Sequence, residues 1–558
     1  MGKSVVCKVW VHFIIGDTQG NNRWVGHYGG TGRLKCPYRD CMCPFDKMEE
    51  SKPRCQYITR KQVEKAIKMN RKDVLHRLSK HPLEIAWHED WVPLSDLIHG
   101  VYKMVPPELL HTTMEGITEY IFQLMKEMIE EYAEGKELLD TIEIIHRKLH
   151  FDKNRHSERD LPSSAARTAL FQLTQVGATE RKGNLFLLLC MSHTAAIRTR
   201  LSLVLMSRGI SLHEFQSCLK LYLAMEEWFH SVNVKDQVEN SRHLVGYVIG
   251  LIKKVFPRGT SARNQGWNIP KMHGLTKMQT YMVQFGSGSN FYGGPGETFH
   301  KKFVKDTGNN TQGRADSFSS QCATRYYESM LFSFSKSNKD MMESKKYKLT
   351  SSEMYSEGRK YEGKFFVDLP SGIATPADKD KKHVEFSLKK ITSSVLDEYL
   401  DSNNYAFKRS IAGYSCCKTI LNETEVKFRC TEDYMGEKWF DWCMVKFQDD
   451  DQTTYTHPAQ ILGFFQLDDK ESDMEDGVFA VVHTSETSIS YEDISAQFIV
   501  SFELGQDREN DLCVVPVYSI VHPLYVFKNE GGLVGEYFCS IPRRHWAEYF
   551  GRKVNLMK

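Results

Sequence analysis

The sequence predicts a multidomain protein in which an α/β segment is interrupted by a large all-α block and followed by an all-β domain. Three observations support this fold class. An apolar run ends on a Gly-Asp pair near residue 17, helical periodicity dominates residues 61–256, and short runs rich in Val, Phe and Tyr follow residue 425. With 558 residues, 41% of them hydrophobic, roughly three to four domains with well-formed cores are expected.

Charge and cysteine usage narrow the class of protein. The formal net charge is only +2, so a surface for nucleic acid has to be local. The 14 cysteines are scattered instead of forming a dense disulfide framework, which predicts a reducing compartment, cytosol or nucleus. No apolar run approaches about 18 residues, so no membrane-spanning helix is predicted.

The first predicted segment, residues 1–60, contains a strand and a cysteine-rich loop. The stretch "FIIGDTQGNN" places apolar Phe13 to Ile15 before Gly16 and Asp17, and turn-forming residues follow. Two interpretations of Asp17 remain open from this pattern alone. It is either a turn residue that accepts hydrogen bonds from its own loop, or a metal-binding carboxylate at the carboxyl end of a strand.

The helical block is predicted over residues 61–256. Its clearest helix opens at Pro106 and Pro107, which suit a first helical turn, and Gly135 is a plausible stop. Between them an apolar stripe with a period near 3.6 residues indicates an amphipathic helix. The stripe consists of Leu110, Ile117, Ile121, Leu124 and Ile129.

Three further segments complete the predicted organisation. Residues 257–335 are rich in Gly, Asn and Lys and return to helix near their end. Residues 336–424 are polar and are interpreted as a loosely ordered linker. Residues 425–558 carry short β-type runs separated by turns, which predicts a small β-barrel or sandwich.

A basic segment runs from Gly250 to Lys305. It contains nine Lys or Arg residues and a single acid, Glu297, with aromatic residues between them. Such a field favours phosphate backbones, although a solvated basic loop remains an alternative. The candidate DNA-binding residues are Lys253, Lys254, Arg258, Arg263, Lys271, Lys301, Lys302 and Lys305.

The single acid of this segment suggests a metal site. Mg²⁺ is held by one or two carboxylates together with substrate phosphates, and two such ions can clamp a phosphodiester. Asp17 and Glu297 are therefore candidate ligands for Mg²⁺ or Mn²⁺. The glycines beside Glu297 would let a backbone approach closely, and His300 lies one turn further on.

A second metal site is suggested by "KCPYRDCMCP". Cys36, Cys41 and Cys43 are closely spaced, and Cys55 follows. The C-x4-C spacing is acceptable for Zn²⁺, but further ligands must come from elsewhere in the chain, with His273 and His111 as candidates. Buried free thiols are the alternative.

Several motifs resemble a known family. "FIIGDTQGNN" is similar to the segment around the second catalytic Asp of CACTA-superfamily DDE transposases, especially the Plavaka-like and KDZ-like elements. "VPPELLHTT", "IPKMHGL" and "GGPGETFHKK" resemble the helix opening, the histidine motif and the final acid of the same family, and "WFDWCMVKF" with "PAQILGFF" resembles a small β-domain near its C-terminus. The order and spacing of these motifs carry the resemblance, which touches most of residues 5–330 and part of the C-terminus.

The resemblance implies an RNase H-like fold with the helical block as an insertion. It makes Asp17 the second catalytic acid and Glu297 the third, with Mg²⁺ or Mn²⁺ as cofactor. It also assigns Cys36, Cys41 and His273 to a zinc site that braces the insertion. The implied activity is metal-dependent cleavage and strand transfer on double-stranded DNA in the nucleus, with a homo-oligomer as a further candidate partner.

Two departures from the family pattern change this expectation. The sequence starts shortly before Asp17, so the first acid and its strands are expected to be missing and the core to be incomplete, as in an N-terminally truncated transposase. Lys277 stands where relatives often carry a second histidine. The alternatives are a catalytically inactive DNA-binding or protein-interaction module derived from a transposase, and a zinc-braced helical interaction protein in which Asp17 and Glu297 lie far apart.

Overall fold

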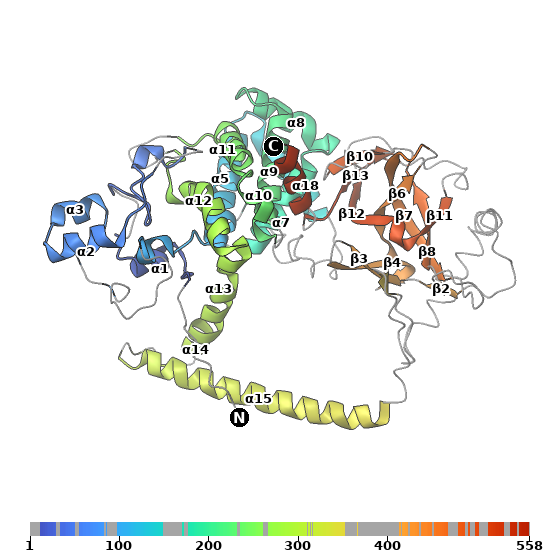
Figure 1. Ribbon diagram of the computed structural model, residues 1–558. Helices are drawn as coiled ribbons and strands as arrows, with labels where there is room; N and C mark the ends of the chain where they lie inside the picture. The colour runs from blue at the N-terminus through green and yellow to red at the C-terminus, as the bar shows by residue number, and fades with distance from the viewer. Residues whose placement is uncertain are drawn as a thin grey trace. The chain divides into compact units, whose positions relative to one another are not determined.

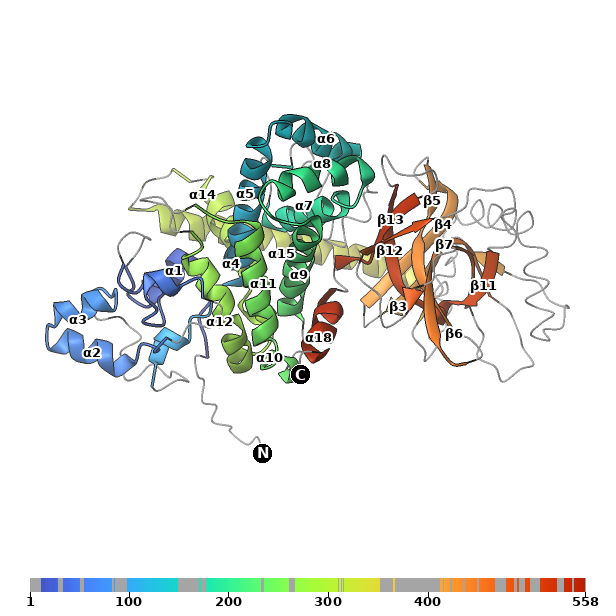
Figure 2. The ribbon, with the colours of Figure 1, turned by 90° about the horizontal axis from the view of Figure 1, so that it is seen from above.

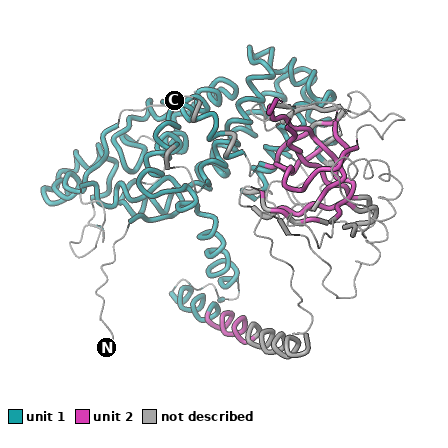
Figure 3. The backbone as a smooth tube through the Cα atoms, turned by 45° about the vertical axis from the view of Figure 1, so that its right-hand side comes forward, with its two compact units in different colours: residues 1–326, 543–558 teal, residues 327–542 magenta. Residues whose placement is uncertain are grey.

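The computed structural model forms two compact units, which are described separately (Figure 3). Unit 1 comprises residues 1–326 and 543–558, and unit 2 comprises residues 327–542. The described residues are 12–28, 34–50, 55–82, 85, 98–148, 170–171, 177–231, 235–259, 266–309, 311–312, 314, 316–351, 365–366, 412–414, 416–421, 424–434, 437–448, 451–466, 478–485, 489–490, 497–501, 512–528, 536–543 and 546–556.

Unit 1 begins with a small lobe of short helices, blue in Figure 1. A capping box between Thr59 and Gln62 starts its longest helix, because each side chain satisfies a free backbone N–H of the other residue. Buried Val25, Ile58 and Val63 are part of its core. The helices are α1 (Thr18–Trp24), η1 (Phe45–Lys47), α2 (Arg60–Lys68), α3 (Lys72–Arg77) and η3 (Gly100–Lys103).

The predicted strand before Asp17 is not observed in the described residues. Residues 12–16 carry no strand, and Asp17 is instead the N-cap of α1. The apolar run is only partly buried, with Ile15 exposed: the backbone N–H of Ile14 donates to the carbonyl of Met104 at 2.8 Å, and the ring of Phe13 lies 4.9 Å from that of Phe285. Residues 1–11, the rest of the predicted strand, lie outside the described residues.

The remainder of unit 1 is a helical bundle arranged around a central helix, α9 (Leu212–His230), which is buried on several sides (Figure 2). Its neighbours include α7 (Ala178–Met191), α8 (Ala195–Met206) and α11 (Arg242–Val255). The other helices are α4 (Leu109–Thr112), the π-helical η4 (Thr113–Ile117), α5 (Thr118–Glu130), α6 (Gly135–Lys148), α10 (Lys235–Val238) and α12 (Pro270–Phe285).

The C-terminus of the chain differs from its predicted assignment to the β-domain. Residues Trp546–Leu556 form helix α18, which belongs to unit 1 and packs along α9 (Figure 1). Trp546, Phe550 and Val554 recur every four residues and are buried, so a single helical face meets the bundle. The ring of Phe550 lies 5.3 Å from that of Trp228.

The segment that carries Glu297 is helical. It consists of η8 (Gly288–Phe291), α13 (Gly294–His300), the π-helical η9 (Lys301–Lys305) and α14 (Asp306–Gly308). Helix α15 (Phe318–Ser351) follows and extends past residue 336, so the start of the predicted linker is helix.

No strand occurs among the described residues from 12 to 351, where β-structure is confined to two isolated bridges. The sheet of an RNase H-like core is therefore not among them. That part of the fold class remains a prediction that depends on the resemblance.

Unit 2 is built from antiparallel sheets, as the β-type runs after residue 425 indicate. Residues 365–366, 412–414 and 416–421, which lie in the predicted linker 336–424, are also strands of these sheets. Strand β7 (Thr454–Gln466) lies between β6 (Trp442–Gln448) and β8 (Val478–Thr484), and Val445, Ile461 and Val482 belong to one core cluster. A longer sheet has the order β10-β13-β12-β6-β7-β8-β11, with β2 and β9 also paired to β7, and a shorter one has the order β1-β3-β4-β5. The remaining bounds are β1 Phe365–Phe366, β2 Ala412–Tyr414, β3 Cys416–Leu421, β4 Thr424–Tyr434, β5 Glu437–Phe440, β9 Ile489–Ser490, β10 Gln497–Ser501, β11 Leu512–Pro516, η11 Val517–Ser519, β12 Ile520–Lys528 and β13 Glu536–Ser540.

Candidate functional site

A pocket of about 570 Å³ in unit 1 contains both acids that the sequence singles out. Asp17 comes from the start of α1 and Glu297 from α13, and both line this pocket although they lie far apart in the sequence. Glu108, His111 and His300 line it as well. The fold therefore gathers carboxylates and imidazoles from three separate segments into one hollow.

Asp17 fits both interpretations that the sequence left open: it accepts a hydrogen bond from its own loop, and its carboxylate is available to a ligand. Its Oδ1 accepts a hydrogen bond from the backbone N–H of Gly20 at 2.5 Å, which is the N-cap contact of α1. The residue is nevertheless exposed and lines the pocket. Capping uses one carboxylate oxygen, and the carboxylate as a whole remains accessible from the pocket.

Glu108 holds two walls of the pocket together. Its buried carboxylate accepts backbone hydrogen bonds from Leu110 at 2.7 Å and His111 at 2.8 Å, which caps α4, and another from Gly293 on the opposite wall. A Cβ on Gly293 would lie 2.6 Å from this carboxylate, so the close approach requires glycine. Glu108 is not among the site residues predicted from the sequence, although an acid directly before "LLH" is a recognisable helix cap.

His111 connects Glu108 to the pocket acids. Its Nδ1 lies 2.6 Å from Glu108 Oε2, while its Nε2 lies 3.2 Å from Glu297 Oε1 and 3.5 Å from Glu115 Oε2. The hydrogen bond with Glu108 raises the pKa of His111, burial opposes this, and the neighbouring carboxylates add to the increase. His111 is one of the zinc ligands predicted as candidates from the sequence, but in the structure it lines this pocket instead.

Two of the helical segments that carry pocket residues change to π-helical winding, after His111 and after His300. The turn Thr113–Ile117 contains Glu115, and the turn Lys301–Lys305 follows Glu297 and His300. Single π-helical turns are rare and occur frequently at functional sites. Here they contain Glu115 and the exposed lysines that follow His300.

A second group of metal-ligating side chains lies behind the cysteine-rich loop. Cys41, Cys55 and His273 each place one ligand atom within 4.8 Å of the others, and Cys41 Sγ lies 3.3 Å from His273 Nε2. Cys36, which the resemblance assigned to this group, is not part of it. Its thiol instead donates to the carbonyl of Arg77 at 3.1 Å, and Cys55 takes its place in the group.

Lys277 forms a buried ion pair with Asp40 beside this group, where relatives of the predicted family often carry a second histidine. Tyr281 Oη donates to the other oxygen of Asp40 at 2.5 Å. The ammonium group also lies over the ring of Tyr57, 4.3 Å from its centroid. Because Asp40 belongs to the cysteine-rich loop and Lys277 to α12, the pair fastens the loop to that helix.

The predicted DNA-binding residues fall into two groups. Four have partners within the protein: Lys253 with Glu49 at 2.9 Å, Lys254 with Glu214, Arg258 with the carbonyl of Gly266 at 2.8 Å, and Lys271 with the carbonyl of Glu115 at 2.7 Å. Burial also lowers the pKa of Lys271. Arg263 lies outside the described residues.

The other three basic residues, Lys301, Lys302 and Lys305, are exposed. Within the part of the chain that the structure describes, none of them forms an ion pair. They lie on η9, directly after the helix that carries Glu297 and His300. Among the described residues of the basic segment, the positive charge without an ion pair is therefore concentrated next to the pocket.

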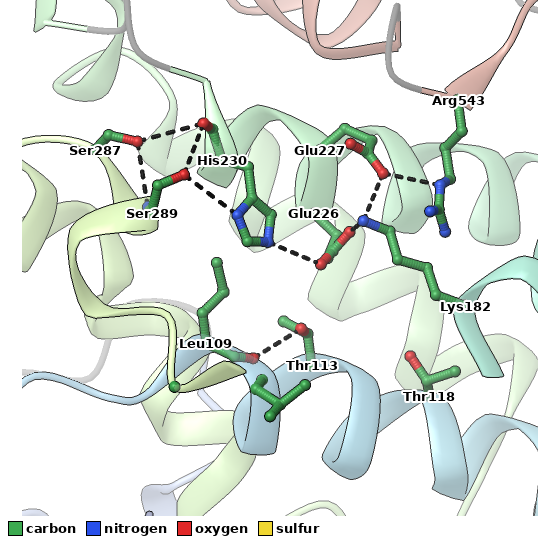
Figure 4. Close-up of polar contacts among 12 residues, drawn as sticks. Leu109, Thr113, Thr118, Lys182, Glu226, Glu227, His230, Ser287, Ser289 and Arg543 are labelled. Atoms are coloured by element: carbon green, nitrogen blue, oxygen red, sulfur yellow. Dashed lines mark hydrogen bonds and ion pairs between the residues drawn. The ribbon is translucent and has the colours of Figure 1, made fainter. Parts of the chain in front are cut away.

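A buried charge cluster lies on α9 behind the pocket (Figure 4). Lys182 pairs with Glu226 and, at 2.5 Å, with Glu227, and Arg543 pairs with Glu227 at 2.8 Å. His230 Nε2 lies 3.3 Å from Glu226. Arg543 is the first residue of unit 1 after unit 2, so this cluster anchors the returning chain.

The cluster touches the pocket through Ser289, whose Oγ lies 3.3 Å from His230 Nδ1. Ser289, His230 and Glu226 are thus in contact in the order of a Ser–His–Glu catalytic triad. Its chemistry is unfavourable here, because burial and the charge of Lys182 lower the pKa of His230 to about 4, which makes the ring a weak base. The carboxylate of Glu226 is already neutralised by Lys182. We therefore interpret the chain of contacts as structural.

No helix among the described residues combines the length and apolar character needed to cross a membrane. Comparisons of the chain with protein families, with curated proteins and with solved structures found no match.

Proposed function

We propose that this chain is a transposase-like protein that binds double-stranded DNA beside the pocket of Asp17 and Glu297 and holds a divalent cation there. The observation that carries the proposal is the presence of both acids in a single pocket. The resemblance to the transposase family requires the two acids to lie close together in the fold. Two unrelated surface carboxylates would have no reason to line the same pocket.

The pocket residues suit a divalent cation such as Mg²⁺ or Mn²⁺. Asp17 and Glu297 are both exposed, and carboxylates are the ligands that such ions prefer. When bound, the cation would activate a water or a 3′-hydroxyl and stabilise negative charge on a phosphate. The protein itself contributes Glu108, which holds α4 and the loop at Gly293 in register and thereby sets the width of the pocket.

The proposed DNA surface is narrower than the basic segment of the sequence. Lys301, Lys302 and Lys305 lie within about two helical turns of Glu297, so a phosphate backbone held by them would pass close to the pocket. The lysines and arginines that have partners within the protein would have to break those contacts before they could bind a phosphate. Binding through phosphates alone should depend little on sequence.

Zinc is the proposed occupant of the Cys41–Cys55–His273 group. A sulfur and a nitrogen bound to one Zn²⁺ lie roughly 3.5 Å apart. The distance of 3.3 Å between Cys41 Sγ and His273 Nε2 is close to that value. Burial raises the pKa of the Cys41 thiol, so a cation would be needed to hold it as thiolate. His273 Nδ1 has no hydrogen-bond partner among the described residues, unlike most zinc-binding histidines.

Replacing Lys301, Lys302 and Lys305 with alanine should weaken duplex binding for all sequences alike. The slope of log affinity against log salt should become shallower by about three, roughly 0.9 for each lost phosphate contact. Fluorescence anisotropy of labelled duplexes between 50 and 300 mM salt measures both quantities. The matched control is K61A/K65A/K68A, which removes the same charge from the exposed face of α2.

Equal affinities and slopes for the two triple variants would exclude the η9 lysines as the DNA surface. The same preparations distinguish the enzyme from an inactive binding module. Nicking of a supercoiled plasmid that requires Mn²⁺ and disappears in D17N/E297Q supports catalysis. Binding without such nicking favours a transposase-derived DNA-binding module.

A further inference from the structure

We propose that the imidazole Nε2 of His111 is a third ligand of the cation in this pocket, and that it makes the site prefer a first-row transition ion such as Mn²⁺ over Mg²⁺. The inference rests on the proposed function, because Asp17 and Glu297 are the other ligands. Neither the sequence pattern nor the resemblance assigns His111 to this cation.

The distance between the donor atoms of His111 and Glu297 matches that of two ligands of one ion. Two ligands that each lie about 2.1 Å from one ion are roughly 3.0 to 3.4 Å apart. His111 Nε2 and Glu297 Oε1 are 3.2 Å apart. These two groups already have the separation of neighbouring ligands. Among the described residues only Cys41, Cys55 and His273 bring three ligand atoms within 4.8 Å of one another, so Asp17 has to move towards His111 and Glu297 when the ion binds.

The His111 ring is oriented as in a metal-binding histidine. Metal-binding histidines almost always donate their other ring N–H to a carboxylate or carbonyl, which fixes the tautomer and the direction of the free nitrogen. Glu108 plays this part at 2.6 Å from Nδ1. Its own carboxylate is buried and accepts three backbone N–H groups, so it is committed to positioning and is not itself a ligand.

Carboxylates surround the His111 ring on more than one side. A simple ion pair between a protonated His111 and one glutamate would also give a short contact. The imidazole, however, faces Glu297 and Glu115 together, and Asp17 lines the same pocket. Glu108, Glu115 and Glu297 contact this ring, and the Lys271 ammonium is the cation that interacts with Glu108 and Glu115. A protonated imidazole and this ammonium leave one negative charge, to which Asp17 in the same pocket adds a second. A divalent cation would neutralise this surplus.

The choice of ion follows from the donor types. Mg²⁺ strongly prefers oxygen ligands and gives up its water reluctantly. A mixed set of one imidazole and carboxylates suits first-row transition ions, whose affinity for nitrogen ligands is higher. His111 should thus raise the affinity for Mn²⁺ without raising that for Mg²⁺.

The test is a Mn²⁺ titration of the full-length, zinc-loaded chain, followed by electron paramagnetic resonance, with Mg²⁺ as competitor. The wild type should bind Mn²⁺ at least about tenfold more tightly than Mg²⁺, and H111A should lose most of that preference. Pulsed resonance should show a ¹⁴N coupling of a metal-bound imidazole in the wild type and none in H111A. H300A is the matched control, because His300 is the other histidine lining the pocket.

E108Q tests the positioning role separately. It should weaken Mn²⁺ binding about 10- to 100-fold but keep the ¹⁴N coupling, because the ligand is still present. If H111A fails to fold, wild-type protein grown with ¹⁵N-histidine supplies the same evidence. The ¹⁴N signal must then change to a ¹⁵N signal, and it must do so in H300A as well.

Two outcomes would overturn the inference in different ways. If D17N and E297Q abolish binding of both ions while H111A changes neither affinity nor the ¹⁴N coupling, His111 is not a ligand and the proposed function survives. If D17N and E297Q leave the binding of both ions unchanged, the pocket is not a cation site, and the proposed function fails together with the inference.

Discussion

Replacing Lys182 with methionine should lower the free energy of unfolding of unit 1 by about 3 to 5 kcal/mol. Lys182 is buried between Glu226 and Glu227, so its removal leaves negative charge inside the bundle without its main partner. Urea unfolding monitored by hydrogen exchange of the α9 amides would measure the loss. The effect should be confined to unit 1, which carries all three residues.

Two further variants sharpen this experiment. K126M removes a lysine whose partner, Glu130, is about half exposed, and should cost less than about 1 kcal/mol. Combining K182M with E226Q should recover part of the loss, because one of the uncompensated charges is gone. A loss below about 1 kcal/mol in K182M would mean that the cluster is solvated and does not anchor the chain at Arg543.

Replacing Asp40 with alanine should have an effect of similar size at the cysteine-rich loop. Lys277 would remain buried in α12 with its carboxylate partner removed, at a cost of about 3 to 5 kcal/mol. The loop would separate from α12, so Cys41 and Cys55 would lose their position relative to His273. Bound zinc, measured by atomic emission on purified protein, should fall from about one per chain to a small fraction of that.

The compensating variant D40A/K277M separates the two consequences. It removes both charges, so stability should return towards that of the wild type. Its zinc content should also recover if the ion pair acts only by positioning the loop. Wild-type stability in D40A would contradict the account of Asp40 as the brace of this loop.

The sequence predicts local structure better than it predicts contacts between segments. The helical character of residues 109–255 follows from periodicity, since this signal is contained in the segment that folds. The predicted bounds are wrong: α4 begins after the N-cap Glu108 and not at Pro106, and Gly135, predicted as a stop, is the first residue of α6. The apolar run at Phe13 is ambiguous, because burial against Phe285 and burial in a sheet produce the same composition. Helix α18 was missed because its apolar face, with Trp546, Phe550 and Val554, is short and follows directly on β-type sequence.

For the candidate site, too, the sequence reveals single residues better than contacts between segments. Asp17 and Glu297 could be selected because each is an acid in an unusual context. The role of Glu108 depends on Gly293 approaching from another segment, which no local pattern reveals. The choice between Cys36 and Cys55 likewise depends on which thiol the fold turns towards His273, and the spacing of the cysteines does not contain that information.

The central claim is that Asp17, His111 and Glu297 hold one divalent cation. Anomalous diffraction at the manganese edge, from crystals of the full chain grown with Mn²⁺, tests it most directly. The account predicts a peak in the pocket with Asp17, His111 Nε2 and Glu297 each about 2.0 to 2.3 Å away. Well-ordered pocket walls without a manganese peak, or a peak bound only at the Cys41–His273 group, would contradict the account.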